Sequence, residues 1–463
     1  MSAGIDRPHP PAPAWQTLVQ MLRGSLLLKG SADYELHRHV WNGAIDRYPL
    51  AIARCIDAED VRATVQFAGL ARIPMTVRGG GHNVAGLAVR DDALMVDLGA
   101  MNRVEVDPVS RTVRVEGGAL WRDVDAATQP HGLATTGGFV STTGIGGYTL
   151  GGGVGWLMRR CGLAIDNLIE ADVVLADGRD VVASEQKHPD LFWALRGGAG
   201  GFGVVTHFTY RLHAVSEVSA GVIFHPIEAA ADLLRVFRLI TPAAPDALTA
   251  MLVFTTAPPL PFLPSEVHGQ RVIALAYCWS GEPEQGARVC APLAGWGRPL
   301  GRHEGVLPYA TWQQTFDPTA PPGNHYYWTT SQFDVLDDTL IQTLLRYAIT
   351  PADPLSEVHI HHLGGAVAAV PGSATAFSQR EATFFANAIG RTDTTERFPA
   401  VREWARSLRA ALAPHARAGV QPNFTAEAGD LGTCTHDSAV SSRLATVRKR
   451  YDPDGVFASA RRG

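Results

Sequence analysis

The sequence Arg-Gly-Gly-Gly-His-Asn occupies residues 78–83, directly after a predicted short strand, Pro74 to Val77. Glycine has no Cβ, so three consecutive glycines let backbone N–H groups approach a pyrophosphate closely and allow positive φ angles. A second glycine-rich segment reads Thr-Thr-Gly-Ile-Gly-Gly at residues 142–147 and continues to Gly155. Together the two segments predict a nucleotide-sized ligand bound by backbone amides from two separate loops.

A dinucleotide-binding βαβ unit does not explain these glycines. No helix with an apolar face opens after Gly81, and no acidic residue ends a second parallel strand at the expected distance. Each glycine-rich run taken alone is also typical of a flexible loop or of tight turns.

The rest of the chain has an α+β pattern. From Pro49 to about Val215, short strands flank the turns Asp107-Pro108 and Asp177-Gly178, and an amphipathic helix is predicted from Glu59 to Arg72. After about Val215, longer strands alternate with longer helices, which predicts an antiparallel sheet backed by helices. The predicted strands there are Thr249 to Thr255, Val272 to Trp279, His325 to Phe333 and Val358 to Val370, and the predicted helices are Ile227 to Leu239, Leu340 to Tyr347 and Arg397 to Leu412.

Composition excludes several classes of partner. The chain has 463 residues, 46% of them hydrophobic, and a formal net charge of −5 without a basic block. We therefore expect no nucleic-acid partner and no membrane partner, and no apolar run reaches the about 18 residues that span a bilayer. Five scattered cysteines argue against a disulfide framework or a zinc cluster. The proline-rich start, Met1 to Trp15, lacks the features of a signal peptide, so we expect a disordered lead-in and a cytoplasmic location. Nothing in the sequence indicates the oligomeric state.

Six motifs then follow one another in order along the chain. They are residues 78–83, Gly137 to Trp156, Cys161 to Asn167, Asp190 to Gly198, Phe202 to Thr206, and Tyr451-Asp452-Pro453 with Phe457. This set resembles the berberine-bridge-enzyme-like oxidases, within the vanillyl-alcohol-oxidase and p-cresol-methylhydroxylase flavoprotein fold. The resemblance runs from Pro49 to the C-terminus and implies FAD as the cofactor. It also implies an α+β fold, with a two-part FAD-binding domain of the p-cresol-methylhydroxylase type and a substrate domain with an antiparallel sheet backed by helices.

The expected domain boundaries follow from this organisation. We expect an N-terminal lead-in at residues 1–40, an FAD-binding domain at 41–215 and a substrate-binding domain at 216–415. A C-terminal segment at 416–463, with a helix from Ser441 to Tyr451, is expected to return to the FAD-binding domain.

His82 lies within the first loop, where three glycines and an asparagine leave an imidazole little to pack against. By resemblance, His82 bears an 8α-histidyl bond to FAD; the attacking nitrogen must be neutral, which is feasible near an ordinary pKa of roughly 6.5. A buried structural histidine is the alternative. Some relatives add a cysteinyl bond just before the second loop, but that position is Val140 here and Cys161 lies too far along. The resemblance therefore implies one covalent link.

Other FAD contacts are also implied by resemblance. Residues 161–167 resemble the flavin-contacting loop, Val205 matches a residue whose backbone meets the adenine, and Asn423-Phe424 resembles the segment that closes over the flavin ring. The full expected set of cofactor-binding residues is Arg78, Gly79, Gly80, Gly81, His82, Asn83, Gly86, Gly138, Thr142, Thr143, Gly144, Gly146, Gly147, Gly152, Gly153, Gly162, Asp166, Asn167, Val205, Asn423 and Phe424.

Thr143 matches the position thought to gate oxygen above the flavin, and it is not a bulky leucine. The expected function is therefore an FAD-dependent oxidase that removes a hydride from a small organic substrate and passes the electrons to O2, forming H2O2. The substrate could be a sugar, alcohol, phenol, alkaloid or polyketide. A dehydrogenase with another acceptor is the main alternative.

The catalytic base is harder to identify, because Gln421 stands where many relatives carry a tyrosine and cannot take a proton. Tyr326 and Tyr327 alternate faces in one predicted strand, so one of them should point toward the flavin. His361 shares a strand face with His359 and is the third candidate. His359 and His361 could instead be metal ligands in a hydrolase. Because the tyrosine is missing, a protein that carries flavin but catalyses no reaction is a further alternative.

Overall fold

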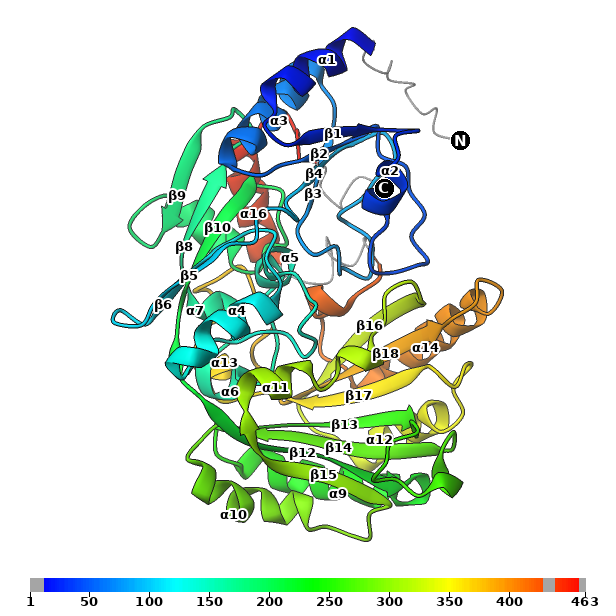
Figure 1. The fold of residues 1–463 in the computed structure, drawn as a ribbon. Coiled ribbons are helices and arrows are strands. Elements are labelled where there is room, and N and C mark those ends of the chain that lie inside the picture. Colours follow the sequence, from blue (N-terminus) through cyan, green and yellow to red (C-terminus); the bar gives the residue numbers. More distant parts are fainter. Residues whose placement is uncertain (1–11, 428–437, 458–463) are drawn as a thin grey trace.

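Two main sheets build the part of the structure that carries both glycine-rich segments, and a third, larger sheet lies beside them (Figure 1). The computed structural model describes residues 12–427 and 438–457. Residues 1–11 of the predicted lead-in, Cys434, and residues 458–463 of the predicted C-terminal segment lie outside the described residues. The α+β fold class and the antiparallel sheet backed by helices are confirmed.

The first sheet has four strands in the order β1 (Ser25–Leu28), β2 (Ala51–Arg54), β4 (Leu94–Asp97) and β3 (Met75–Arg78). Strands β2, β4 and β3 run parallel, so the first glycine run leaves the carboxyl end of β3. Helix α3 (Ala58–Ala71) begins at the N-cap Asp57, whose side chain accepts a hydrogen bond from the Asp60 N–H. Its buried Val61 and Val65 share a core cluster with residues from both neighbouring sheets, which fixes the sheets relative to each other.

The second sheet has five antiparallel strands in the order β5 (Val104–Asp107), β6 (Thr112–Glu116), β10 (Val204–Arg211), β8 (Leu168–Val174) and β9 (Asp180–Ser184). Both predicted hairpins, β5–β6 and β8–β9, are confirmed. Its core is shared with α4 (Trp121–Thr128), α5 (Ile145–Leu150), α8 (Pro189–Leu195) and α16 (Ser438–Tyr451). Four smaller elements complete this part: α6 (Met158–Cys161), α7 (Ala164–Asn167), and the paired strands β7 (Leu133–Ala134) and β11 (His213–Ala214).

The third sheet is entirely antiparallel, in the order β15-β12-β14-β13-β17-β18-β16. In chain order its strands are β12 (Glu217–Pro226), β13 (Leu248–Thr256), β14 (Arg271–Trp279), β15 (Gly301–Pro308), β16 (His325–Phe333), β17 (Glu357–His362) and β18 (Phe384–Thr392). The helices that share its core cluster are α9 (Ala230–Ile240), α10 (Pro283–Ala294), α12 (Asp338–Ala348) and α14 (Phe398–Leu412).

Strand alternation divides this sheet into two faces. On β17, Val358 and Ile360 belong to the core cluster under the helices, whereas His359 and His361 face the opposite way and line a cavity. Successive side chains of a strand point to opposite faces, so the same strands build both a hydrophobic core and a polar wall.

Some predicted boundaries are wrong. The strand predicted from Val358 to Val370 ends at His362, because Gly364 and Gly365 have positive φ angles of +89° and +58° and turn the chain into the short helix α13 (Ala366–Ala369). Residues within the predicted lead-in form α1 (Ala12–Met21), β1 and α2 (Tyr34–Arg38), and β1 pairs with β2 in the first sheet. Strands β12, β15 and β18 and helix α10 were not predicted from the sequence.

The described part of the C-terminal segment lies against the first two sheets. Helix α16 contributes Leu444 and Val447 to the core of the five-stranded sheet, and Phe457 forms a bridge with Met75 of β3. Among residues 12–427 and 438–457, no helix combines the length and the apolar composition that a membrane span requires.

Asp125 of α4 is a carboxyl group buried inside this fold. It is 3% exposed, and the Gln313 side chain of α11 (Tyr309–Gln314) donates a hydrogen bond of 3.4 Å to its carboxyl group. Burial raises the pKa of Asp125 to about 8. Its charged form is therefore disfavoured in the folded state.

Asp125→Asn should stabilise the fold more at high pH than at low pH. An unfolded aspartate has a pKa of about 4, so below that pH burying this carboxyl group does not reduce the free energy of unfolding. Above it, the loss of folding stability grows by on the order of 1 kcal/mol per pH unit up to about pH 8. The melting temperature of the variant relative to wild type should be higher at about pH 8 than at about pH 5. Glu105→Gln, which removes an exposed carboxylate on β5, is the control and should show no such trend. A difference in melting temperature between Asp125→Asn and wild type that is the same at both pH values would contradict the prediction.

Candidate functional site

A cavity of about 530 Å³ lies between the two glycine-rich segments and the polar face of the third sheet. The loops after β3 and before α5 line one part of it, and the loop at residues 198–203 lines another. Side chains from β16, β17 and β18 line the opposite wall. The cavity therefore lies between the part of the chain that carries the sequence motifs and the part that forms the antiparallel sheet.

The two glycine-rich segments touch each other through their backbones. A Cβ atom on Gly144 would stand 2.3 Å from the backbone nitrogen of Gly80, and one on Gly80 would stand 2.6 Å from the Cα of Gly144. Hydrogen bonds from Trp121 N to Thr143 O and from Ile145 N to Ala119 O, each 3.0 Å long, fix the second segment against the start of α4. Only glycine allows this approach, so the shape of the cavity depends on both residues.

His82 lies in a stack of aromatic rings. Trp41 stacks on His82 with ring centroids 4.3 Å apart and on Tyr326 with centroids 3.9 Å apart. The Trp41 N–H donates to the Gly81 carbonyl at 3.1 Å, and the Thr142 hydroxyl lies 3.5 Å from Nε2 of His82. Burial lowers the pKa of His82 to about 4, so its imidazole is neutral at neutral pH.

The structure brings many of the sequence-predicted residues into the cavity wall, and leaves others outside it. Those that line the cavity are Gly79, Gly80, Gly81, His82, Asn83, Gly138, Thr143, Gly144, Gly146, Gly147, Val205, Asn423, Phe424, Tyr326 and His361. Those that are not among the lining residues are Arg78, Gly86, Thr142, Gly152, Gly153, Gly162, Asp166, Asn167 and Tyr327.

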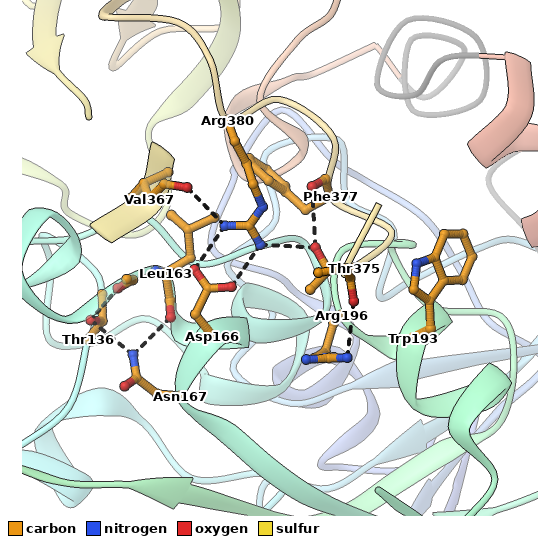
Figure 2. A network of polar contacts seen from close by, with 12 residues as sticks. Thr136, Leu163, Asp166, Asn167, Trp193, Arg196, Val367, Thr375, Phe377 and Arg380 are labelled. Carbon is orange, nitrogen blue, oxygen red and sulfur yellow. Dashed lines mark hydrogen bonds and ion pairs between the residues drawn. The ribbon is translucent and has the colours of Figure 1, made fainter. Parts of the chain in front are cut away.

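Several of the outlying residues position the cavity loops instead. Asp166 pairs with Arg380 through two hydrogen bonds of 2.9 and 2.7 Å, and Arg380 also donates to Thr375 (Figure 2). The Asn167 amide donates to the carbonyls of Cys161 and Leu163, at 3.0 and 2.9 Å. These side chains are engaged by protein groups, which explains why they do not face the cavity.

Other outlying residues hold neighbouring loops in place. Arg78 donates to the His37 and His39 carbonyls and lies 3.6 Å from Asp97. A Cβ on Gly86 would meet the Ile45 side chain at 2.7 Å. The backbone of Gly153 donates to Oδ1 of Asn423 at 3.0 Å, and Asn423 in turn donates to the Tyr148 carbonyl at 3.0 Å. The closing segment is thereby tied to the second glycine-rich segment.

The three candidate bases differ in their surroundings. The Tyr326 hydroxyl donates to the Pro321 carbonyl at 2.7 Å, and burial raises its pKa above the ordinary value. Tyr327 lies on the helix-covered face, where its hydroxyl contacts Glu427 and Arg406; burial raises its pKa to about 12. Tyr326 is therefore the tyrosine that points into the cavity, as strand alternation requires of one of the pair.

His361 is 1% exposed and stacks on Phe385 with centroids 4.2 Å apart. Neither of its ring nitrogens has a hydrogen-bond partner among the described residues, and burial lowers its pKa well below the ordinary value. No group of three or more His, Cys, Asp or Glu side chains that could hold a metal ion occurs within the described ranges.

Part of this cavity wall was not predicted from the sequence. Glu357, Asn387 and Arg391 line the cavity beside His359 and His361. Period-two alternation through Glu357, His359 and His361 could have identified Glu357. Asn387 and Arg391 lie on β18, which was not predicted, and Trp41 lies before the region that carries the motifs.

Comparison with known proteins agrees with this geometry. Residues 49–184 match a family described as an FAD binding domain. The chain is 28% identical to the FAD-linked oxidoreductase pgmH of Aspergillus terreus, over 96% of this chain and 94% of that protein. It is 34% identical to (R)-6-hydroxynicotine oxidase of Paenarthrobacter nicotinovorans, over 44% of each. The solved structure of Physcomitrella patens BBE-like 1 superposes with a TM-score of 0.85 at 21% identity, over 96% of this chain and 98% of that one. The chain therefore contains an FAD binding domain, is similar over almost its whole length to FAD-linked oxidoreductases, and has the vanillyl-alcohol-oxidase and p-cresol-methylhydroxylase fold.

Proposed function

We propose that this enzyme is an oxidase: it removes a hydride and a proton from a small organic substrate, and O2 takes up the electrons as H2O2. The observation that carries the proposal is the cavity itself, with backbone-lined glycine loops on one side and a polar and aromatic wall on the other. We further propose that residues 41–215 and 416–463 bind FAD, and that residues 216–415 bind the substrate.

FAD fits the glycine-lined side of the cavity. Added Cβ atoms on Gly80 and Gly144 would collide with the facing loop, so only glycine at both positions lets the two loops meet, and both residues line the cavity with backbone atoms alone. The glycine loops, Asn83 and Val205 would hold the cofactor, and Asn423 and Phe424 would close over its ring. FAD supplies the two-electron acceptor for the hydride.

A single covalent link at His82 is part of the proposal. A neutral imidazole nitrogen can attack an electrophilic methyl carbon, and the low pKa of His82 keeps it neutral. Val140 lines the cavity at the position where a cysteine would be needed for a second link. Burial raises the pKa of Cys161 to about 11, which keeps that thiol protonated and unreactive.

The choice of O2 as acceptor is supported by Thr143, which lines the cavity with a short side chain. A dehydrogenase that uses another acceptor is the second candidate, because the fold alone does not distinguish the two reactions. The substrate side presents Phe139, Trp328 and Phe424 beside His361. Aromatic faces with a few polar groups suit a flat hydroxylated ring, so a hydroxylated nitrogen heterocycle, the class named in one relative, is the first to test.

His82→Ala should abolish covalent attachment while leaving FAD binding possible. The purified wild-type protein should give a fluorescent band on a denaturing gel, and the variant should give none and release FAD on acid precipitation. His131→Ala removes an exposed histidine elsewhere and should keep the fluorescent band. Fluorescence that persists in His82→Ala would show that another residue carries the link.

Thr143→Leu should slow the reaction with O2 without slowing substrate oxidation. A bulkier side chain would narrow the approach to the flavin, so reoxidation of the reduced enzyme should slow by about tenfold or more, a barrier increase of about 1.4 kcal/mol. Anaerobic reduction by substrate should stay near the wild-type rate. Val140→Leu enlarges a neighbouring lining residue and is the control. Unchanged reoxidation in Thr143→Leu would contradict a gating role.

Gly144→Ala should lower FAD content and stability together. The new methyl group would stand 2.3 Å from the Gly80 nitrogen, so one loop must move; such overpacking costs about 1–3 kcal/mol. The ratio of flavin to protein absorbance and the melting temperature should both fall. Gly305→Ala, where a Cβ meets no atom within 4 Å, should change neither. A fully loaded, fully stable Gly144→Ala protein would rule out the loop contact as a determinant of FAD binding.

A further inference from the structure

A carboxylate–imidazole pair faces the cavity from β17. Nε2 of His359 lies 2.8 Å from Oε2 of Glu357, and both residues line the cavity. Their side chains are 19% and 15% exposed. No sequence motif described above assigns this pair a role.

The pair is held in one orientation. The Thr255 hydroxyl on β13 donates to Oε1 of Glu357 at 2.6 Å, so both carboxylate oxygens are engaged. Because a carboxylate accepts hydrogen bonds only, Nε2 of His359 carries the hydrogen in this contact. In the neutral imidazole Nδ1 is then the nitrogen without a hydrogen, and it has no hydrogen-bond partner among the described residues. An imidazole oriented by a carboxylate in this way can accept a proton at its other nitrogen.

We propose that His359, oriented by Glu357, is the general base of the reaction, an inference that rests on the proposed oxidase function. The O–H or N–H bond of the substrate breaks, and its proton moves to Nδ1 of His359. The hydrogen on the adjacent carbon leaves with its electron pair, and a C=O or C=N bond forms, so the substrate is oxidised by two electrons. Bound FAD would supply the acceptor for this hydride, and O2 would take up the two electrons and two protons as H2O2.

The other candidates are less suited to this step. The Tyr326 hydroxyl is bonded to a backbone carbonyl, and Tyr327 lies on the far face of the sheet. Within the described residues no carboxylate bonds to His361 to stabilise a positive charge, and burial disfavours its charged form. Its two nitrogens and Oδ1 of Asn387 lack partners among the described residues, which suits them to hydrogen-bond the substrate instead.

Asn387 lies beside the pair. It is directly opposite His359 in the β17–β18 register, and both residues line the cavity. A polar group of the substrate that hydrogen-bonds Asn387 would therefore lie next to His359. This places the group that must lose its proton near the base.

The charges around the pair favour an ionised Glu357. Burial alone would raise the pKa of this carboxyl, but the His359 hydrogen bond, the Thr255 hydroxyl and Arg391 on β18 outweigh burial and leave the pKa below its ordinary value. Arg271 on β14, Tyr326 on β16 and His361 on β17 are the other titratable groups that interact with the pair. An ionised Glu357 stabilises the imidazolium that forms when His359 takes the proton.

The first test needs no substrate. Nitrogen NMR of the holoenzyme with isotope-labelled histidine should show His359, assigned by its absence in His359→Asn, as the tautomer protonated at Nε2. Glu357→Gln should perturb that signal, and His303→Asn, which removes an exposed histidine on β15, should not. A His359 that is protonated at Nδ1 and insensitive to Glu357→Gln would overturn the proposal.

The second test measures anaerobic flavin reduction by stopped flow, with 6-hydroxynicotine, cellobiose and hydroquinone as the first probes. In His359→Asn, the rate of flavin reduction by the substrate should be about a hundredfold or more lower than in wild type, at unchanged FAD content. The acidic limb of its pH–rate profile should also be lost. Glu357→Gln should move that limb to lower pH, because the imidazolium loses its stabilising charge. His303→Asn should behave as wild type.

The outcomes separate the two proposals. A loss of rate in Tyr326→Phe with none in His359→Asn would overturn the assignment of the base while leaving the oxidase function intact. If neither the three probes nor a wider metabolite panel reduced the flavin, the proposed function would be contradicted. The NMR experiment would still decide whether His359 has the tautomer that the base requires.

Discussion

The close backbone approach of Gly80 to Gly144 is the constraint on which the rest of the site depends. The first residue follows an edge strand of the mixed four-stranded sheet and the second precedes a helix that packs on the antiparallel five-stranded sheet, so their contact joins two separately built layers. Any side chain at either position would separate these layers. The stack of Trp41 between His82 and Tyr326 then connects the first loop to the third sheet.

The third sheet serves two purposes because its strands alternate. One set of side chains on β16, β17 and β18 is apolar and packs under the helices, and the other set is polar and aromatic and faces the cavity. The rigid core beneath the strands therefore fixes the positions of the polar groups above it. This arrangement suits a site that must hold a donor, an acceptor and a base in fixed geometry without relying on a mobile loop.

Local patterns predicted the fold well, because hairpin turns, helix periodicity and glycine runs depend on neighbouring residues. The site was predicted only in part. The motif containing Asp166 and Asn167 resembles a flavin-contacting loop, yet these side chains bind Arg380 and backbone carbonyls. A motif does not distinguish a ligand contact from a support beneath it. Glu357 and Asn387 gain their positions from strand pairings that span long stretches of sequence, which local patterns do not specify.

The ion pair between Asp166 and Arg380 limits how this enzyme can be recombined with its relatives. Its partners lie in different parts of the chain, one in α7 and the other between β17 and β18, and both are almost fully buried. A chimera that takes its third sheet from a protein without an arginine at this position would leave a buried carboxylate unpaired, at a cost of about 3–5 kcal/mol. The third sheet can therefore be exchanged between relatives only when the two residues are inherited together.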